Sequence, residues 1–413
     1  MIHFNRFTLD NGLRVLVNSD DATPLVAFNL LYQVGAKHEN PERTGFAHLF
    51  EHLMFGGSKN AKNFDTPIQM AGGESNAFTN NDFTNYYVIL PKANIETAFW
   101  LESDRMLELD FSPKTLEVQR QVVIEEYKQR YLNQPYGDVW LLLRPLTYKV
   151  HPYRWATIGK EIRHIEKATL EEVKQFFYHH YAPNNAILTL SGNITPGEAE
   201  KLSRKWFGEI PARQVDRRDI PVEPAQKEPA TLSVRRPVPV NAIYLAYHIG
   251  DRLSGDYYCA DLISDLLAGG PSSRLYQHLV KEKQLFSQID AYITGSVDPG
   301  LFVISGNLNP GISMERAEAA IYNELYPLIQ DRLDNDEVTA MKNKAESAWM
   351  YAQMHILNRA MNLAFFEMLG DPERINTELE SFRRVERNDI TRCAQTMFSE
   401  NNRSILYYYK ESD

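Results

Sequence analysis

The residues best suited to chemistry are two histidines and a glutamate in one short segment. His48, Glu51 and His52 lie in a segment from Ala47 to Phe55 that contains no proline or β-branched residue, which predicts a helix. At about 100° per residue the two histidines lie one turn apart, and the glutamate borders them. Two imidazoles at this spacing can bind one zinc ion, with the carboxylate beside a zinc-bound water. The order His-x-x-Glu-His therefore predicts a hydrolytic zinc centre, with the commoner His-Glu-x-x-His order reversed.

A buried structural helix is the alternative interpretation of this segment, because leucine and phenylalanine surround the histidines. Two imidazoles and a carboxylate on an apolar helix would cost several kcal/mol of desolvation without a partner. The desolvation cost favours a metal.

A zinc site with two histidines needs a third protein ligand and one position open to water. The helix predicted from 113 to 131 offers Glu125 and Glu126. Neighbouring helical residues point about 100° apart, so only one of the two can face the metal. Spacing alone leaves this choice open.

Composition restricts the class of protein. The chain has 413 residues, 43% of them hydrophobic, and a formal net charge of −10. Lysine and arginine form no basic stripe, so nucleic acid is not predicted as a partner. No apolar run approaches the roughly 18 residues of a membrane span. The N-terminus has the pattern of a strand hairpin rather than a signal peptide, so we expect a cytoplasmic protein, or a periplasmic one if a signal was removed. The two cysteines, Cys259 and Cys393, fit a reducing compartment better than a disulfide framework.

Strand and helix patterns alternate along the chain. The clearest are strands at 25–34 and 186–193 and helices at 95–109 and 196–207. A segment rich in proline and charge interrupts them near the midpoint, which predicts a stiff, extended linker. We therefore expect a zinc-bearing domain at 1–211, a linker at 212–239 and a second domain at 240–413. The predicted fold is α+β, with two similar domains in tandem, each a sheet with helices on one face.

The second half repeats the first without its metal residues. Residues 261–270 align without a gap on 48–57, and an apolar strand precedes both segments. Asp261, Ser264 and Asp265 take the places of the two histidines and the glutamate. One fold therefore occurs twice, with a metal site in the first copy only.

A polar, extended segment from Asn76 to Thr79 precedes a good strand. It fits an ordinary edge strand. It also fits a backbone template to which an extended peptide adds as a further strand.

Taken together, the chain resembles the pitrilysin/insulinase superfamily of inverted-motif zinc peptidases, in particular the catalytic subunits of its mitochondrial-processing-peptidase-like bacterial branch. The stretches that carry the resemblance are 45–52, 73–79 with Asp82 and Thr84, 122–126 and 133–137. They are specific in combination, and the resemblance extends over essentially the whole chain.

The resemblance implies one zinc ion per chain, held by His48, His52 and Glu126. It implies that Glu51 takes a proton from the attacking water and returns it to the leaving amine. In related sequences an acidic residue often stands seven positions before the glutamate ligand, whereas this chain has Gln119.

The resemblance also concerns the substrate. It implies that Asn76, Ala77 and Phe78 pair with the backbone of an extended or unfolded peptide. The expected activity is that of a zinc metalloendopeptidase. The alternative is a non-catalytic scaffold or interaction subunit of the same fold, which would have no reason to keep the zinc residues.

The resemblance further implies that this chain is half of a clamshell built from four such units. In related enzymes an arginine and a tyrosine of a non-zinc repeat reach the substrate, but the matching strand at 300–309 has neither. Arg274 and Tyr276 are interpreted as the start of a helix and its packing. We therefore expect a heterodimer with a similar-sized subunit that lacks zinc, with a homodimer as the alternative.

Overall fold

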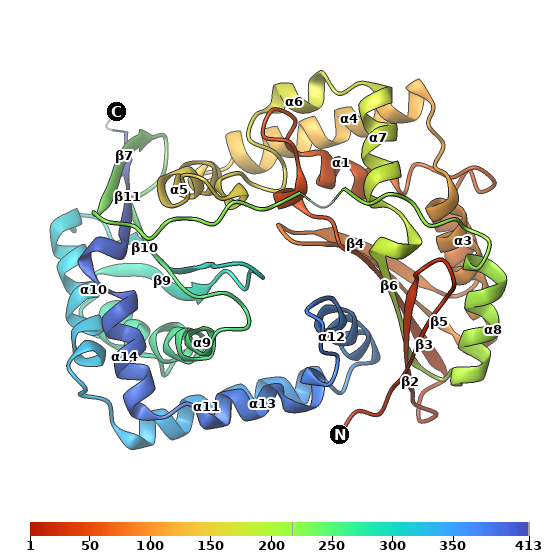
Figure 1. Ribbon diagram of the computed structural model, residues 1–413. Helices are drawn as coiled ribbons and strands as arrows, with labels where there is room; N and C mark the ends of the chain where they lie inside the picture. The colour runs from red at the N-terminus through yellow and green to blue at the C-terminus, as the bar shows by residue number, and fades with distance from the viewer. Residues whose placement is uncertain (217, 412–413) are drawn as a thin grey trace. The chain divides into compact units, whose positions relative to one another are not determined.

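The computed structural model describes residues 1–216 and 218–411 (Figure 1). The chain forms two compact units, and each takes segments from both halves of the sequence. Unit 1 comprises Met1–Gln129, Trp155–Ile220 and Met350–Thr377; unit 2 comprises Arg130–Arg154, Pro221–Trp349 and Glu378–Asp413. The units thus differ from the continuous domains that we expected at 1–211 and 240–413, because each half of the chain contributes one segment to the other unit.

Unit 1 contains a six-stranded sheet that is antiparallel except where β2 pairs with β6. In spatial order its strands are β1 (Asn5–Thr8), β2 (Arg14–Ser19), β6 (Ala186–Gly192), β3 (Leu25–Tyr32), β5 (Thr84–Pro91) and β4 (Glu74–Thr79). The two strands expected from the sequence are present as β3 and β6, and β4 lies at an edge. Every residue of β6 is buried, so both faces of the sheet are covered at its centre.

Several helices of unit 1 begin where a side chain caps the first turn. They are α1 (Phe46–Leu53), α2 (Asp65–Met70), α3 (Ile95–Leu107), α4 (Pro113–Tyr127), α6 (Ile162–Glu166), α7 (Leu170–His180), α8 (Pro196–Phe207) and α12 (Ile356–Met368). The Ser112 hydroxyl accepts a hydrogen bond from the Thr115 N–H at 3.1 Å, and Pro113 follows at the first helical position. This cap fixes the start of α4, and the helix continues into a π-helix at Lys128–Leu132.

Helices cover both faces of the first sheet, whereas we expected them on one face (Figure 1). On one face Phe28 of β3 contacts Phe99 of α3, with ring centroids 5.0 Å apart. On the other face the Thr189 hydroxyl of β6 donates a hydrogen bond to the Ala360 carbonyl of α12 at 2.8 Å. The helix α12 comes from the C-terminal half of the chain, which no local pattern indicates.

Unit 2 contains a five-stranded sheet with the spatial order β7 (Ala230–Arg236), β11 (Arg403–Lys410), β8 (Ala242–His248), β10 (Leu301–Leu308) and β9 (Phe286–Ile293). Its helices are α5 (Val139–Thr147), α9 (Gly255–Ala268), α10 (Met314–Ile329), α11 (Asn335–Ala352, whose last residues belong to unit 1), α13 (Arg374–Arg384, which begins in unit 1) and α14 (Arg387–Met397), with a π-helix at Tyr276–Glu282. Part of the expected linker at 212–239 is strand β7, because it finds a parallel partner in β11.

The two sheets repeat one topology. The order β2-β6-β3-β5-β4 corresponds to β7-β11-β8-β10-β9, with one parallel pair followed by antiparallel pairs in both sheets. The internal repeat is therefore visible in the strand connections as well as in the sequence. In the same order of elements α5 corresponds to α12. Each of these two helices packs on the sheet of the other half: Val139 and Leu143 of α5 join the core of unit 2.

No helix in the described residues has the length and apolar character needed to cross a membrane.

Candidate metal centre

The segment that carries the candidate metal ligands forms the eight-residue helix α1, as its sequence predicts. Gly45 precedes it with φ 91°, a left-handed conformation that glycine adopts without strain. Phe46, Leu49 and Phe50 are buried and fix one side of the helix in the core. His48 and His52 lie on the same face, with ring centroids 4.8 Å apart.

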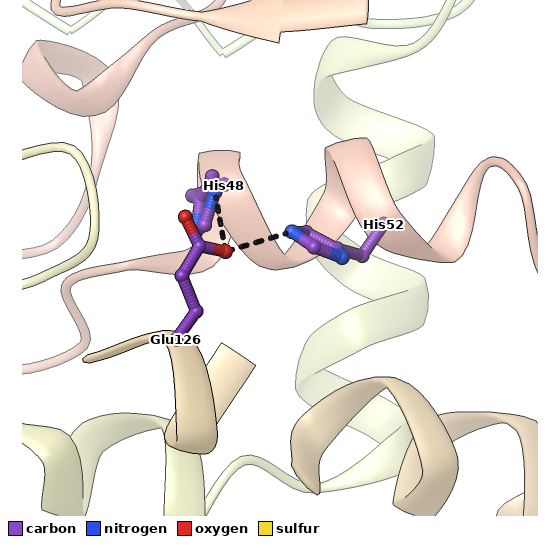
Figure 2. Close-up of side chains that lie close together, drawn as sticks. All are labelled: His48, His52 and Glu126. Atoms are coloured by element: carbon purple, nitrogen blue, oxygen red, sulfur yellow. Dashed lines mark ion pairs between the residues drawn. The ribbon is translucent and has the colours of Figure 1, made fainter. Parts of the chain in front are cut away.

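Glu126 of α4 completes a three-residue cluster with the two histidines (Figure 2). Its Oε2 atom lies 3.6 Å from His48 Nε2 and 3.4 Å from His52 Nε2. Glu125, by contrast, is exposed and forms an ion pair with Lys128 at 2.7 Å. Of the two glutamates that spacing left open, the structure brings Glu126 to the histidines. Among the described residues, this is the one group of three His, Cys, Asp or Glu side chains close enough to hold a metal ion.

The distances within the cluster fit a zinc ion. Two ligand atoms at about 2.0–2.2 Å from a tetrahedral zinc lie about 3.3–3.6 Å from each other. A charge-assisted hydrogen bond between the same atoms would be about 2.7–2.9 Å long. Two nitrogens and one carboxylate oxygen are also a donor set that catalytic zinc sites use, with the fourth position open. The side chains of His48, His52 and Glu126 are 13%, 23% and 19% exposed, so the cluster is accessible.

Glu51 lies one residue before His52 and is largely buried. Burial raises the pKa of its carboxyl group, while hydrogen bonds from the Thr79 side chain and backbone oppose that rise. The Glu126 carboxylate adds to the rise, and His52 opposes it. Glu51 thus lies beside the metal cluster and contacts the last residue of β4.

The strand β4 pairs with β5 on one side, and no strand in the described part of the chain pairs with its other side. The Ala77 N–H donates a hydrogen bond to the Asn76 side-chain oxygen at 2.8 Å and not to β5. The backbone of Ala77 therefore faces the open edge of the sheet. The N–H and C=O of one residue point to the same side of an antiparallel strand, and alternate residues share that side. Thr79, two residues on, accordingly directs its N–H to Glu51. Phe78 is 37% exposed.

A buried carboxylate holds the N-terminus of α1, which the sequence analysis did not foresee. Glu39 is 3% exposed. Its two oxygens accept hydrogen bonds from the Gly45 N–H at 2.9 Å and from the Ala47 N–H at 2.8 Å. Burial raises the pKa of Glu39 to about 8, and these N–H groups, together with Trp155, act against the rise. Because Gly45 has no side chain to cap the helix, Glu39 supplies the acceptor for its first N–H groups.

Gln119 stands where related sequences often carry an acid. The side-chain amide of Gln119 lies near Gly56, in the segment just after α1. The residue therefore remains near the metal helix but brings no charge.

In unit 2 a lysine ammonium lies in the region that corresponds, by the internal repeat, to the cluster of His48, His52 and Glu126. Asp261 and Asp265 of α9 align with His48 and His52, and Lys344 of α11 contacts Asp265 Oδ1 at 2.7 Å. In the order of elements α11 corresponds to α4, the helix that carries Glu126. Burial, and then the Asp265 carboxylate, raise the pKa of Asp261 to about 6. The second copy thus pairs an acidic residue with a cation of the chain itself.

Arg274 and Tyr276 lie where we expected a helix start. Arg274 forms two hydrogen bonds to the Glu337 carboxylate, at 2.8 and 2.7 Å, and Tyr276 begins the π-helix. The Arg274 contacts fit the packing interpretation, whereas the Tyr276 side chain is 41% exposed.

Comparisons with known proteins agree with this fold. The family model described as "Insulinase (Peptidase family M16)" matches residues 14–142. The model described as "Peptidase M16 inactive domain" matches residues 167–345. The zinc protease PqqE of Helicobacter pylori is 28% identical over 408 residues, which cover 97% of this chain and 91% of that protein. The uncharacterized zinc protease YmxG of Bacillus subtilis is 23% identical over 402 residues, covering 96% of each chain. The crystal structure of a protease from Helicobacter pylori has a TM-score of 0.93 at 27% identity, over 99% of this chain and 100% of that one.

Two sheet-and-helix units of one topology, the first with the His-x-x-Glu-His sequence on a helix, define the class of protein. The chain belongs to the M16 family, the insulinase- and pitrilysin-like peptidases, with an N-terminal M16 domain and a C-terminal M16 inactive domain. The absence of the metal residues from α9 agrees with the second of these descriptions.

Proposed function

We propose that this chain is a zinc metalloendopeptidase that hydrolyses extended or unfolded peptides. The observation that carries the proposal is the convergence of His48, His52 and Glu126 beside Glu51, at the end of an open strand edge. A pure scaffold has no need to keep these four side chains together.

The residues of the site would act in named roles. His48, His52 and Glu126 would hold the zinc ion, which when bound polarises the scissile carbonyl and lowers the pKa of water. Glu51 accepts the proton of the attacking water and delivers it to the leaving amine. Burial raises the pKa of this carboxyl group, which makes the carboxylate a stronger base for the first transfer. Thr79 fixes the orientation of this carboxylate.

The substrate would bind as a strand along β4. The backbone of Ala77 faces the open edge and can exchange hydrogen bonds with an extended peptide. For this the Asn76 side chain must leave the Ala77 N–H, which it covers at present. Folded proteins have few free backbone groups, so the proposed substrates are unfolded segments.

One matched pair of variants and a third variant test the proposal. Metal analysis of the purified chain is expected to find about one zinc per chain. Glu126→Gln should lose zinc, whereas Glu125→Gln, its exposed neighbour, should keep it. Glu51→Gln should keep zinc and cleave a quenched unstructured peptide about 10²–10⁴-fold more slowly. Equal cleavage by wild type and Glu51→Gln would refute the mechanism, and zinc binding without cleavage in any assembly would favour the scaffold alternative.

We further propose that the active form is a heterodimer with a similar-sized subunit that lacks the zinc residues. This rests on the arginine and tyrosine of related enzymes, which strand β10 does not contain. Light scattering and a peptide assay on the chain alone and with its partner would test the proposal. Weak activity that a second subunit restores supports it, an active homodimer supports the alternative, and a fully active monomer contradicts both.

A further inference from the structure

The two cysteines of the chain meet in the core of unit 2, although they are far apart in sequence. The sequence contains Cys259 and Cys393 and no other cysteine. Cys259 lies on α9 and Cys393 on α14, and both belong to one buried cluster. They are 3% and 5% exposed, and neither forms a disulfide in this structure.

A contact at the start of α9 places the Cys393 thiol beside the helix face that carries Cys259. The Cys393 thiol donates a hydrogen bond to the Asp256 carbonyl, with 3.8 Å between sulfur and oxygen. Asp256 and Cys259 are three residues apart on one helix, so they share a face. The two thiols also interact directly: a hydrogen bond with Cys393 lowers the pKa of Cys259, and the same bond raises that of Cys393.

Two thiols in contact are unusual for a chain with so few cysteines. A buried residue touches about 6–12 others, so two cysteines placed at random in this chain would meet in about 1–3% of cases. Simple core packing explains why each cysteine is buried, since free cysteine behaves as a small apolar residue. It does not explain why the two lie against each other.

A small molecule can approach the pair. A cavity of about 340 Å³ in unit 2 has Cys393 and Asp256 in its wall, together with His248, Gln226 and Asn402. Hydrogen peroxide is far smaller than this space. The cavity therefore lets a polar oxidant come close to Cys393 without unfolding of the unit.

From this geometry we propose that Cys259 and Cys393 form a redox-active thiol pair, which peroxide converts to a disulfide between α9 and α14. One sulfur attacks a peroxide oxygen; the O–O bond breaks, and a sulfenic acid and one water result. The second thiol then attacks the sulfenic sulfur, an S–S bond forms, and a second water leaves. Two thiols are oxidised by two electrons in total, and one peroxide is reduced to two waters.

Mass spectrometry of the whole chain tests this directly. The reduced protein is treated with equimolar hydrogen peroxide, unfolded and alkylated, and its intact mass is measured. We expect a monomer two hydrogen atoms lighter with no alkyl group, and two alkyl groups after a thiol reductant. The oxidised protein should also unfold at a midpoint about 5–10 °C higher, because the bond closes a long loop.

Single variants provide the controls. Cys259→Ser and Cys393→Ser should each lose both the mass decrease and the rise in midpoint. Two alkylatable thiols after peroxide, a sulfinic acid on one sulfur, or a disulfide between two chains would each overturn the proposal. The wild-type measurement needs no variant to fold, and it does not depend on peptidase activity.

Discussion

Replacing Glu39 with alanine removes the carboxylate that accepts two N–H groups at the start of α1. Both N–H groups are buried with it, and an unsatisfied buried donor costs about 1–3 kcal/mol. The expected loss is therefore about 2–6 kcal/mol, concentrated on a helix that is too short to be stable alone. Glu39→Gln keeps one acceptor oxygen, so about half of this loss is expected.

The loss of order at α1 should appear as weaker zinc binding. Zinc binding to the variant must restore the helix that positions His48 and His52. At about 1.4 kcal/mol per tenfold change, even the smaller loss of 2 kcal/mol corresponds to roughly 30-fold weaker binding. Competition with a fluorescent zinc chelator at 25 °C measures this ratio, alongside thermal unfolding.

The control is Glu42→Ala, which removes an exposed glutamate from the same loop. It should leave both zinc affinity and the unfolding midpoint near those of the wild type. If Glu39→Ala binds zinc within about threefold of the wild type, the argument that this carboxylate holds α1 is wrong.

Two further predictions concern stability. Asp261 has a pKa of about 6 in the folded chain against 3.8 ordinarily. Its favourable contribution to the free energy of unfolding is therefore complete below pH 3.8 and is lost as the pH rises through 6. Asp261→Asn should therefore stabilise the chain against urea by up to about 3 kcal/mol above pH 7 and have little effect below pH 4; a pH-independent difference would contradict this. Leu363→Ala on α12 should cost about 2–5 kcal/mol, because Leu363 is fully buried. The exposed Met354→Ala is its control, and faster proteolysis near 350–355 in the Leu363 variant alone is the expected readout.

Local chemistry explains why much of the site could be predicted from the sequence. The histidine spacing places both rings on one helix face, and Ser112 followed by Pro113 marks the start of α4. Spacing could not choose between Glu125 and Glu126, because that choice depends on the rotation of α4 against α1. Only the resemblance selected Glu126, and the geometry agrees.

Other features depend on contacts between distant segments, which no local pattern encodes. Glu39 lies in a polar loop, and the folded loop places its carboxylate at the start of α1. Strand β7 lies in a proline-rich segment and becomes a strand because β11, far along the chain, pairs with it. The periodicities of α5 and α12 indicate helices with an apolar face, but not which of two similar sheets each covers.

The exchange of α5 and α12 has a consequence for synthesis on the ribosome. The last strand of the first sheet ends at Gly192, whereas α12 ends at Met368, 176 residues later (368 − 192). At about 5–20 residues per second, this interval lasts roughly 9–35 s. Throughout it the nascent sheet lacks the helix that covers the face of Asn29 and Thr189. A ribosome-bound chaperone has that interval to protect the uncovered face. If translation ends early, the released N-terminal half lacks α12 and cannot complete its own core.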